Sequence, residues 1–219
     1  ESSDSDSDSD NGVINEDNHQ RNDIMVSIKT LEKELIAVLL HDLRNYSLKK
    51  YERRQLVGYL LRLKQHDLTL AIFLSQQTKD IAAKTRKVKL QGDSTLYAKE
   101  LSNLVCKSIA DVINEYQRLF NSNTRDNNNN NNNTSQSLSV VITWMVKELK
   151  KFYALLRKQL FKVFVPSSDG FITFSSSLKY LFHAIRTYLG KSGLNVTFFI
   201  INYIKEDLVL LINDCFTDM

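Results

Sequence analysis

The sequence predicts an all-α protein, built as a helical bundle or rod. Its 219 residues include only 6 Gly and 1 Pro, too few for the many turns of a β-sandwich, a barrel or repeated βαβ units. Hydrophobic residues make up 42% of the chain, which is ample for a core. Apolar residues also recur at spacings of three and four over long segments, a pattern typical of amphipathic helices.

The first 22 residues differ in composition from the rest of the chain. The Ser-Asp repeat from Ser3 to Asp10 carries no apolar side chain, so burial cannot offset the entropy cost of ordering it. We therefore expect residues 1–22 to form a disordered acidic tail, with a solvated linker as its simplest role. Because its serines precede acids, as acidophilic kinases prefer, four of them are candidate phosphorylation sites: Ser3, Ser5, Ser7 and Ser9.

Residues 23–120 predict a first helical bundle. Its first helix is expected to begin at an N-cap, Asn22 or Asp23. Further helices are expected over 49–63, 66–88 and 95–120, the last after a Gly92-Asp93 turn. The inward stripe of the first helix comprises Ile24, Ile28, Leu31, Leu35, Val38, Leu39, Leu43 and Tyr46. The stripe of the fourth comprises Leu101, Leu104, Val105, Ile109, Val112, Ile113, Tyr116, Leu119 and Phe120.

Residues 121–136 contain a run of asparagines and predict a flexible loop that divides the chain. A second bundle is expected over 137–219. Its first helix spans about 137–165 and stops at Pro166, and the next spans about 175–189 and ends at Gly190. The last spans about 196–215. Residues 171–174 alternate weakly and fit either a short extended piece or an extra helix.

No constellation of residues predicts catalysis or metal binding. The four histidines are scattered, zinc spacings are absent, and His41-Asp42 fits a surface pair. Gly190-Lys191-Ser192 resembles the end of a phosphate-binding loop, but Ile185 occupies the position of that motif's first glycine. We therefore predict no enzyme activity, no cofactor, no metal and no small-molecule substrate.

The cysteines and the hydropathy of the chain indicate its redox environment and whether it spans a membrane. Cys106 and Cys215 make no disulfide framework, which favours a reducing compartment. The longest apolar stretch, 194–204, is too short to span a bilayer and is interrupted by polar residues. The sequence therefore predicts no transmembrane helix.

Charge is distributed unevenly along the chain. Residues 1–23 carry eight acids and one base, whereas the remainder carries 28 bases and 17 acids. An anionic partner must therefore be considered for the folded part. No helix-turn-helix or RNA-binding aromatic strand accompanies this charge, so nucleic acid is not predicted as a partner.

The helix expected over 137–165 concentrates basic residues on one side. On a helical wheel, four lysines fall within about 60° of one another, and Trp144 falls on the same side. This arrangement suits an acidic partner, an anionic membrane surface or a neighbouring helix. The alternative is a solvated face with Trp144 covered by the preceding loop, because rows of charge usually serve solubility. The candidate partner or lipid surface comprises Trp144, Lys147, Lys151, Lys158 and Lys162.

The segment from Tyr59 to Ser102 resembles a known family. It reads Tyr-Leu-Leu-Arg-Leu at 59–63, a leucine- and alanine-rich stretch ending in Phe-Leu at 73–74, Gly-Asp-Ser-Thr-Leu-Tyr at 92–97, and Glu-Leu-Ser at 100–102. This order is similar to the C-terminal region of the eighty-four-kilodalton subunit of the exocyst, the complex that tethers secretory vesicles. The match is best over residues 50–120, and the Asn-rich insertion departs from the family pattern.

The resemblance implies an elongated rod of two stacked antiparallel helical bundles, as in related tethering subunits and cullin repeats. It implies a non-catalytic scaffold, located in the cytoplasm at secretory vesicles and at plasma-membrane sites of polarised secretion. Other exocyst subunits are the implied partners, with SNARE-related proteins, polarity proteins and an anionic membrane surface as further ones. The alternative from the residues themselves is a peripheral membrane-binding module that uses the lysine face.

Overall fold

The protein is all-α in the computed structural model, as predicted. Helices account for nearly all of the described residues, and no strand occurs among them. The structure describes residues 11–45, 48–89, 92–120, 131–160, 167–193 and 196–217; for 11–20, 131–136, 168, 192, 211 and 214–217 it describes the backbone. Contacts divide the chain into unit 1, Glu1–Gln65, and unit 2, His66–Met219. The predicted domain boundaries and the stacking of two bundles into a rod stay predictions.

The described part of unit 1 consists of α1 (Asn11–Leu43) and α2 (Lys50–Arg62), which pack against each other. Helix α1 begins at Asn11 rather than near Asp23, so the backbone of residues 11–22 continues the helix toward the N-terminus. Once a helix is nucleated, each further residue adds a hydrogen bond at little cost, which allows this extension. Residues 1–10, with the candidate phosphoserines, lie outside the described residues.

The predicted stripe of α1 is largely exposed in the structure. Leu43, at its C-terminal end, is fully buried, but Ile28 and Leu31 are 54% and 65% exposed. Helix α2 buries Val57 and Leu60. It ends in a turn in which Lys64 takes a left-handed φ of 58° and Gln65 N donates to Leu60 O. Periodicity therefore predicted a helix over residues 24–43 correctly, but the predicted burial of its apolar stripe was wrong for most of its length.

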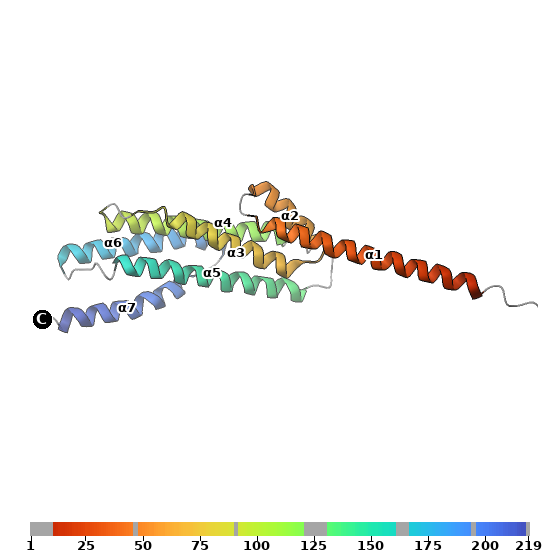
Figure 1. Ribbon diagram of the computed structural model, residues 1–219. Coiled ribbons are helices and arrows are strands. Elements are labelled where there is room, and N and C mark those ends of the chain that lie inside the picture. Colours follow the sequence, from red (N-terminus) through yellow and green to blue (C-terminus); the bar gives the residue numbers. More distant parts are fainter. Residues whose placement is uncertain are drawn as a thin grey trace, which may run out of the picture. The chain divides into compact units, whose positions relative to one another are not determined.

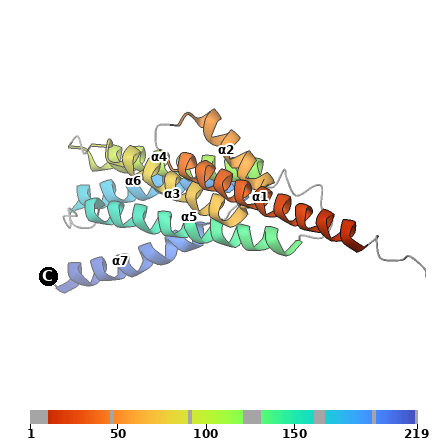
Figure 2. The same cartoon turned by 45° about the vertical axis from the view of Figure 1, so that its right-hand side comes forward.

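Within its described residues, unit 2 is a bundle of five α-helices, and consecutive helices run in opposite directions (Figure 1). The helices are α3 (His66–Thr85), α4 (Ser94–Phe120), α5 (Asn131–Leu160), α6 (Ser168–Ala184) and α7 (Thr197–Thr217). Helix α4 contacts α3, α5 and α6, and α7 packs on α5. Both ribbon views show α7 on the far side of α5 from α4 (Figure 2).

The core of unit 2 is centred on α4, whose predicted stripe is largely buried. Twelve residues of α4 are buried, and α3 buries Leu70, Phe73, Leu74 and Ile81 against the bundle. At one end of the bundle, Phe120 contacts the rings of His66, Phe73 and Tyr116, with centroids 5.2, 5.9 and 5.3 Å away. In α5, the apolar residues spaced by three and four from Val141 to Leu160 are buried, whereas Leu138, one turn earlier, is 47% exposed.

Turn residues set the ends of several helices. Asp93, placed in a turn by the sequence, is the residue that caps α4, because its Oδ1 accepts from Thr95 N at 2.8 Å and from Leu96 N at 3.2 Å. Helix α6 begins at Ser168 instead of near Ser175, because Ser167 Oγ accepts from Gly170 N at 3.1 Å. Residues 171–174 are consequently helical, and the extended alternative was wrong.

The end of α6 also differs from the expectation. The chain continues from α6 as a π turn, Ile185–Leu189, and a 3₁₀ turn, Gly190–Ser192. Gly190 keeps helical dihedrals with φ −59°, and Gly193 takes the left-handed conformation with φ 76°. The glycine that stops the helix is therefore Gly193, not Gly190, because only Gly enters this conformation without steric cost.

Candidate interaction surfaces

Helix α5 positions the tryptophan and lysines singled out in the sequence. Lys147, Lys151 and Lys158 are exposed on α5, whereas Lys162 lies outside the described residues. Trp144 is only 8% exposed. Its Nε1 donates to Thr78 Oγ1 of α3 at 2.8 Å, so the indole belongs to the α3–α5 packing. Trp144 is therefore not part of an exposed partner or lipid surface, and this element of the prediction is corrected.

A hydrogen-bonded chain continues from Trp144 to the surface. The Thr78 hydroxyl donates to Glu148 Oε1 at 2.9 Å, and Lys151 Nζ donates to the same oxygen at 2.7 Å. Glu148 is 5% exposed, so its carboxylate requires these donors to replace lost water. Lys151 thus has a structural partner. By contrast, Lys147 and Lys158 form no ion pair within the described part of the chain.

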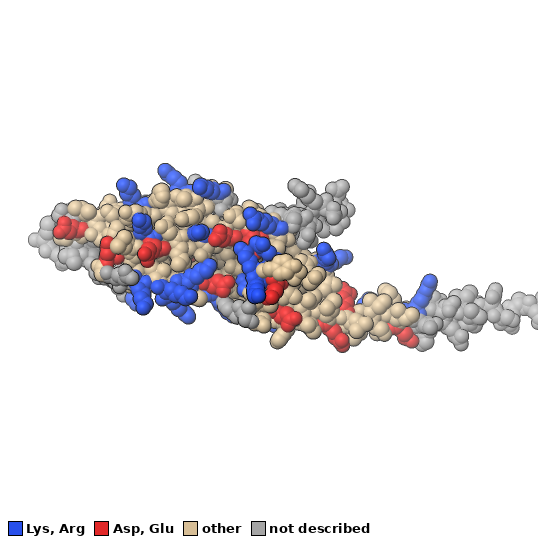
Figure 3. Space-filling view, turned by 90° about the horizontal axis from the view of Figure 1, so that it is seen from above, with Lys and Arg blue, Asp and Glu red and all other residues tan. Residues whose placement is uncertain are grey.

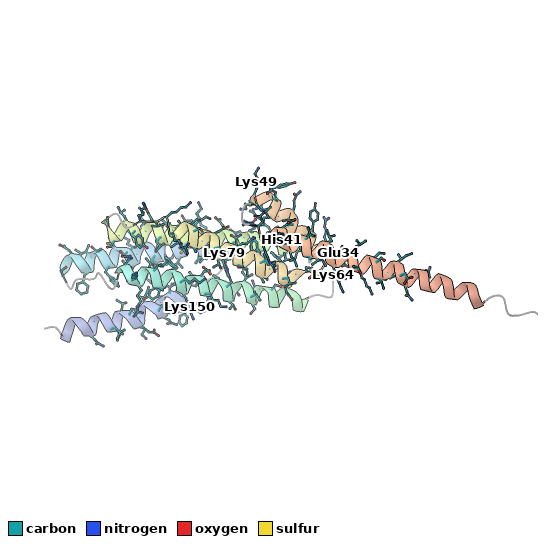
Figure 4. The ribbon with its side chains drawn as sticks, in the orientation of Figure 1. Glu34, His41, Lys49, Lys64, Lys79 and Lys150 are labelled. Atoms are coloured by element: carbon teal, nitrogen blue, oxygen red, sulfur yellow. The ribbon has the colours of Figure 1, made fainter. Side chains whose placement is uncertain are left out.

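A second polar cluster joins α5 to α7. Tyr153 Oη donates to Asp207 Oδ2 at 2.5 Å, and Arg157 Nη2 lies 2.9 Å from Asp207 Oδ1. Lys150 projects from α5 toward α7 (Figure 4), where its Nζ lies 5.8 Å from the Tyr203 ring centroid. Burial, followed by the hydrogen bond and charge of Asp207, raises the pKa of Tyr153 well above its usual range. These contacts hold α7 against α5.

A pocket of about 530 Å³ lies between α6 and α7. Its lining is basic and apolar, comprising Lys179, Phe182, His183, Arg186, Thr197 and Ile201. The three basic residues are spaced by four and three along α6 and its π turn, which places them on one side. This basic row was not predicted, although its spacing of four and three is present in the sequence.

The rest of α7 offers an apolar surface next to this pocket. Phe198, Ile201, Val209 and Ile212 are 67%, 45%, 50% and 47% exposed. Their spacings of three, eight and three place them within about 80° on the helix. We call these four residues the α7 stripe.

Three findings bear on other classes of site. Within the described residues, no three His, Cys, Asp or Glu side chains come together as a metal site. None of the helices that the structure describes is long and apolar enough to span a bilayer. His41 lies 3.5 Å from Asp42 with both side chains exposed, which confirms the predicted surface pair.

The surface seen in Figure 3 carries charges of both signs. Lys and Arg side chains are interspersed with Asp and Glu over this face rather than separated from them. Mixed charge of this kind is typical of a solvated protein surface. The overall excess of basic residues therefore does not make this face a uniformly basic one.

Comparisons with known proteins agree with the resemblance. Residues 2–180 match the family described as "Exocyst component 84 C-terminal". The "Exocyst complex component EXO84" proteins of two strains of Cryptococcus neoformans var. neoformans serotype D, JEC21 and B-3501A, are each 25% identical over 146 residues. The aligned region covers 66% of this chain and 20% of each relative, so the match spans about a fifth of their length. No solved structure matches the chain.

Proposed function

The chain belongs to the exocyst component 84 C-terminal family, and on that premise we propose that it is part of a scaffold subunit of the exocyst. In this role it tethers secretory vesicles to the plasma membrane before fusion, through contacts with other proteins. The family match over residues 2–180 carries the proposal. Its partners are other exocyst subunits first, with SNARE-related and polarity proteins as further candidates, and its location is the cytoplasm at sites of secretion.

The structure supports a scaffold rather than a catalyst. The polar clusters around Glu148 and Asp207 are satisfied by structural partners and lie between packed helices. Exposed apolar side chains on α1 and α7 are available to pack against helices of other proteins. The alternative, a membrane-binding module on the lysine face, loses support because Trp144 is buried.

The proposal is tested by purifying the tagged full-length protein from its own cells. We expect the other exocyst subunits to be recovered with it in constant proportion, and depletion to leave secretory vesicles accumulated beneath the plasma membrane. Recovery without any exocyst subunit would overturn the proposal. As a second arm, Lys147→Glu with Lys158→Glu should leave sedimentation with phosphatidylserine vesicles unchanged; loss of vesicle binding would favour the membrane-binding alternative.

A further inference from the structure

We propose that the groove between α6 and α7 binds an amphipathic helix of another subunit, one that carries acidic residues beside its apolar face. This inference deepens the proposed function and rests on it, because it names the surface that the scaffold offers. The surface consists of the α7 stripe, the pocket, and the basic row Lys179, His183 and Arg186. Each part restricts the chemistry of the occupant.

The pocket selects for negative charge. Its six lining residues include three basic side chains and no acid. Within the described residues, neither Lys179 nor Arg186 has a carboxylate partner, and the His183 ring meets only the Thr187 hydroxyl, at 3.4 Å. Phe182 and Ile201 add apolar lining to the same pocket. An acidic side chain attached to an apolar segment satisfies both parts of this lining.

The α7 stripe selects for a helix. From Phe198 to Ile212 the stripe extends along about 21 Å of helix at 1.5 Å per residue. Side chains at helical spacing form a ridge that packs between the ridges of a partner helix. Ile201 belongs both to the stripe and to the pocket, so a helix lying on the stripe brings its flank to the basic row.

Lys205 distinguishes a protein partner from a membrane. It is exposed and falls within the arc of the α7 stripe, whereas Glu206 and Asp207 fall outside it. Insertion of this face into a bilayer would carry the Lys205 ammonium toward hydrocarbon, which is costly. A partner helix instead places a carboxylate opposite Lys205, so the observations favour an acidic helix over a lipid surface.

The test uses the full-length protein in its assembled complex. A photo-cross-linking amino acid replaces Ile201, the complex is irradiated, and the cross-linked peptide is sequenced by mass spectrometry. We expect a segment of another exocyst subunit with apolar residues at spacings of three and four and flanking acids. Lys179→Glu with Arg186→Glu should lower the cross-link yield about tenfold or more. The matched control, Lys84→Glu with Lys107→Glu, changes net charge equally and should leave the yield unchanged.

A charge exchange makes the test specific. Replacing the acids of the identified segment with lysine should restore cross-linking to the Lys179→Glu, Arg186→Glu protein. Circular dichroism verifies that each variant is folded, which is expected because the changed side chains are exposed. If no exchange restores cross-linking, the charge pairing proposed here is wrong.

The remaining outcomes separate this inference from the proposed function. If other exocyst subunits are absent from the purified complex, the proposed function fails. If they are present but Ile201 cross-links to no protein, to its own chain or to a segment without acids, the groove proposal alone fails. Cross-links to lipid, or loss of phosphatidylserine-vesicle binding in the charge-reversal variant, would assign the groove to a membrane and likewise overturn it.

Discussion

Trp144 donates its indole N–H to the hydroxyl of Thr78 across 2.8 Å, linking α5 to α3. The same hydroxyl donates to the buried Glu148 carboxylate. Thr78→Val keeps the shape of the side chain but removes the hydroxyl that the Trp144 indole and the Glu148 carboxylate both contact. The free energy of unfolding should therefore fall by about 2 kcal/mol. Urea denaturation measures the change. Thr143→Val is the control, because the Thr143 hydroxyl bonds only its own helix at Ser139 O; equal effects of the two changes would contradict the prediction.

Lys151 and Lys147 should respond differently to charge reversal. Lys151 lies 2.7 Å from the buried Glu148 carboxylate, so Lys151→Glu removes a donor and adds a like charge. Because the Lys151 side chain is 59% exposed, solvent screening limits the loss of stability to about 1 kcal/mol. Lys147→Glu, on the same face, should leave the thermal midpoint nearly unchanged. A similar fall of the thermal midpoint in both variants would show that the ion pair between Lys151 and Glu148 does not stabilise the fold.

Tyr153→Phe should destabilise the protein most at neutral pH. Burial and the Asp207 hydrogen bond raise the pKa of Tyr153 above its ordinary value near 10. A pKa raised on folding gives stability that is complete below the unfolded value and is lost as pH rises above it. The difference between wild type and Tyr153→Phe should therefore be constant from pH 7 to about 9 and shrink above about pH 10. Denaturation over that pH range measures it; a difference that stays constant to about pH 11 would exclude this linkage.

Cys106 should be unreactive in the folded protein. It is fully buried in α4, and burial raises the pKa of its thiol to about 12, so almost no thiolate is present at neutral pH. In a Cys215→Ser background, a thiol reagent should label the protein only after denaturant is added. Rapid labelling of the native protein would mean that α4 opens readily.

Two glycines close together should tolerate alanine differently. Gly193 has φ 76°, so Gly193→Ala places a side chain in the left-handed conformation and should lower stability by about 1 kcal/mol. Gly190 has helical dihedrals, and no neighbouring atom lies within 4 Å of the position that an alanine Cβ would take there. Gly190→Ala should therefore be neutral or slightly stabilising. Thermal unfolding of both variants gives the comparison, and the reverse order would refute the assignment of the helix stop.

Periodicity and capping predicted most of the fold. The stripe of α4 and the turn before it at Gly92-Asp93 were confirmed because both depend on local sequence signals. The predicted starts of α1 and α5 were too late in the sequence. The first turns of both helices are mostly polar, so no apolar residues recur there with the helical period that would reveal them. A continuing helix does not require such a period, since backbone hydrogen bonds extend it.

The candidate surface could be predicted only in part. A helical wheel placed Trp144 beside the lysines, but it could not show that Thr78 of α3 covers that part of α5. In the same way, the wheel identified the apolar stripe of α1 without showing that Leu31 is exposed. Burial depends on which helices pack against each other, and the spacing of apolar residues along one helix does not determine that packing.

The central position of α4 in unit 2 limits how its amino-acid sequence can change during evolution. A substitution at a site such as Leu101 or Ile109, both fully buried, must be accommodated by neighbours from several helices at once. A change at Leu31, by contrast, disturbs little within its own unit. Inherited differences between species should therefore be rare at the buried positions of α4, whose sequence has the least freedom to drift.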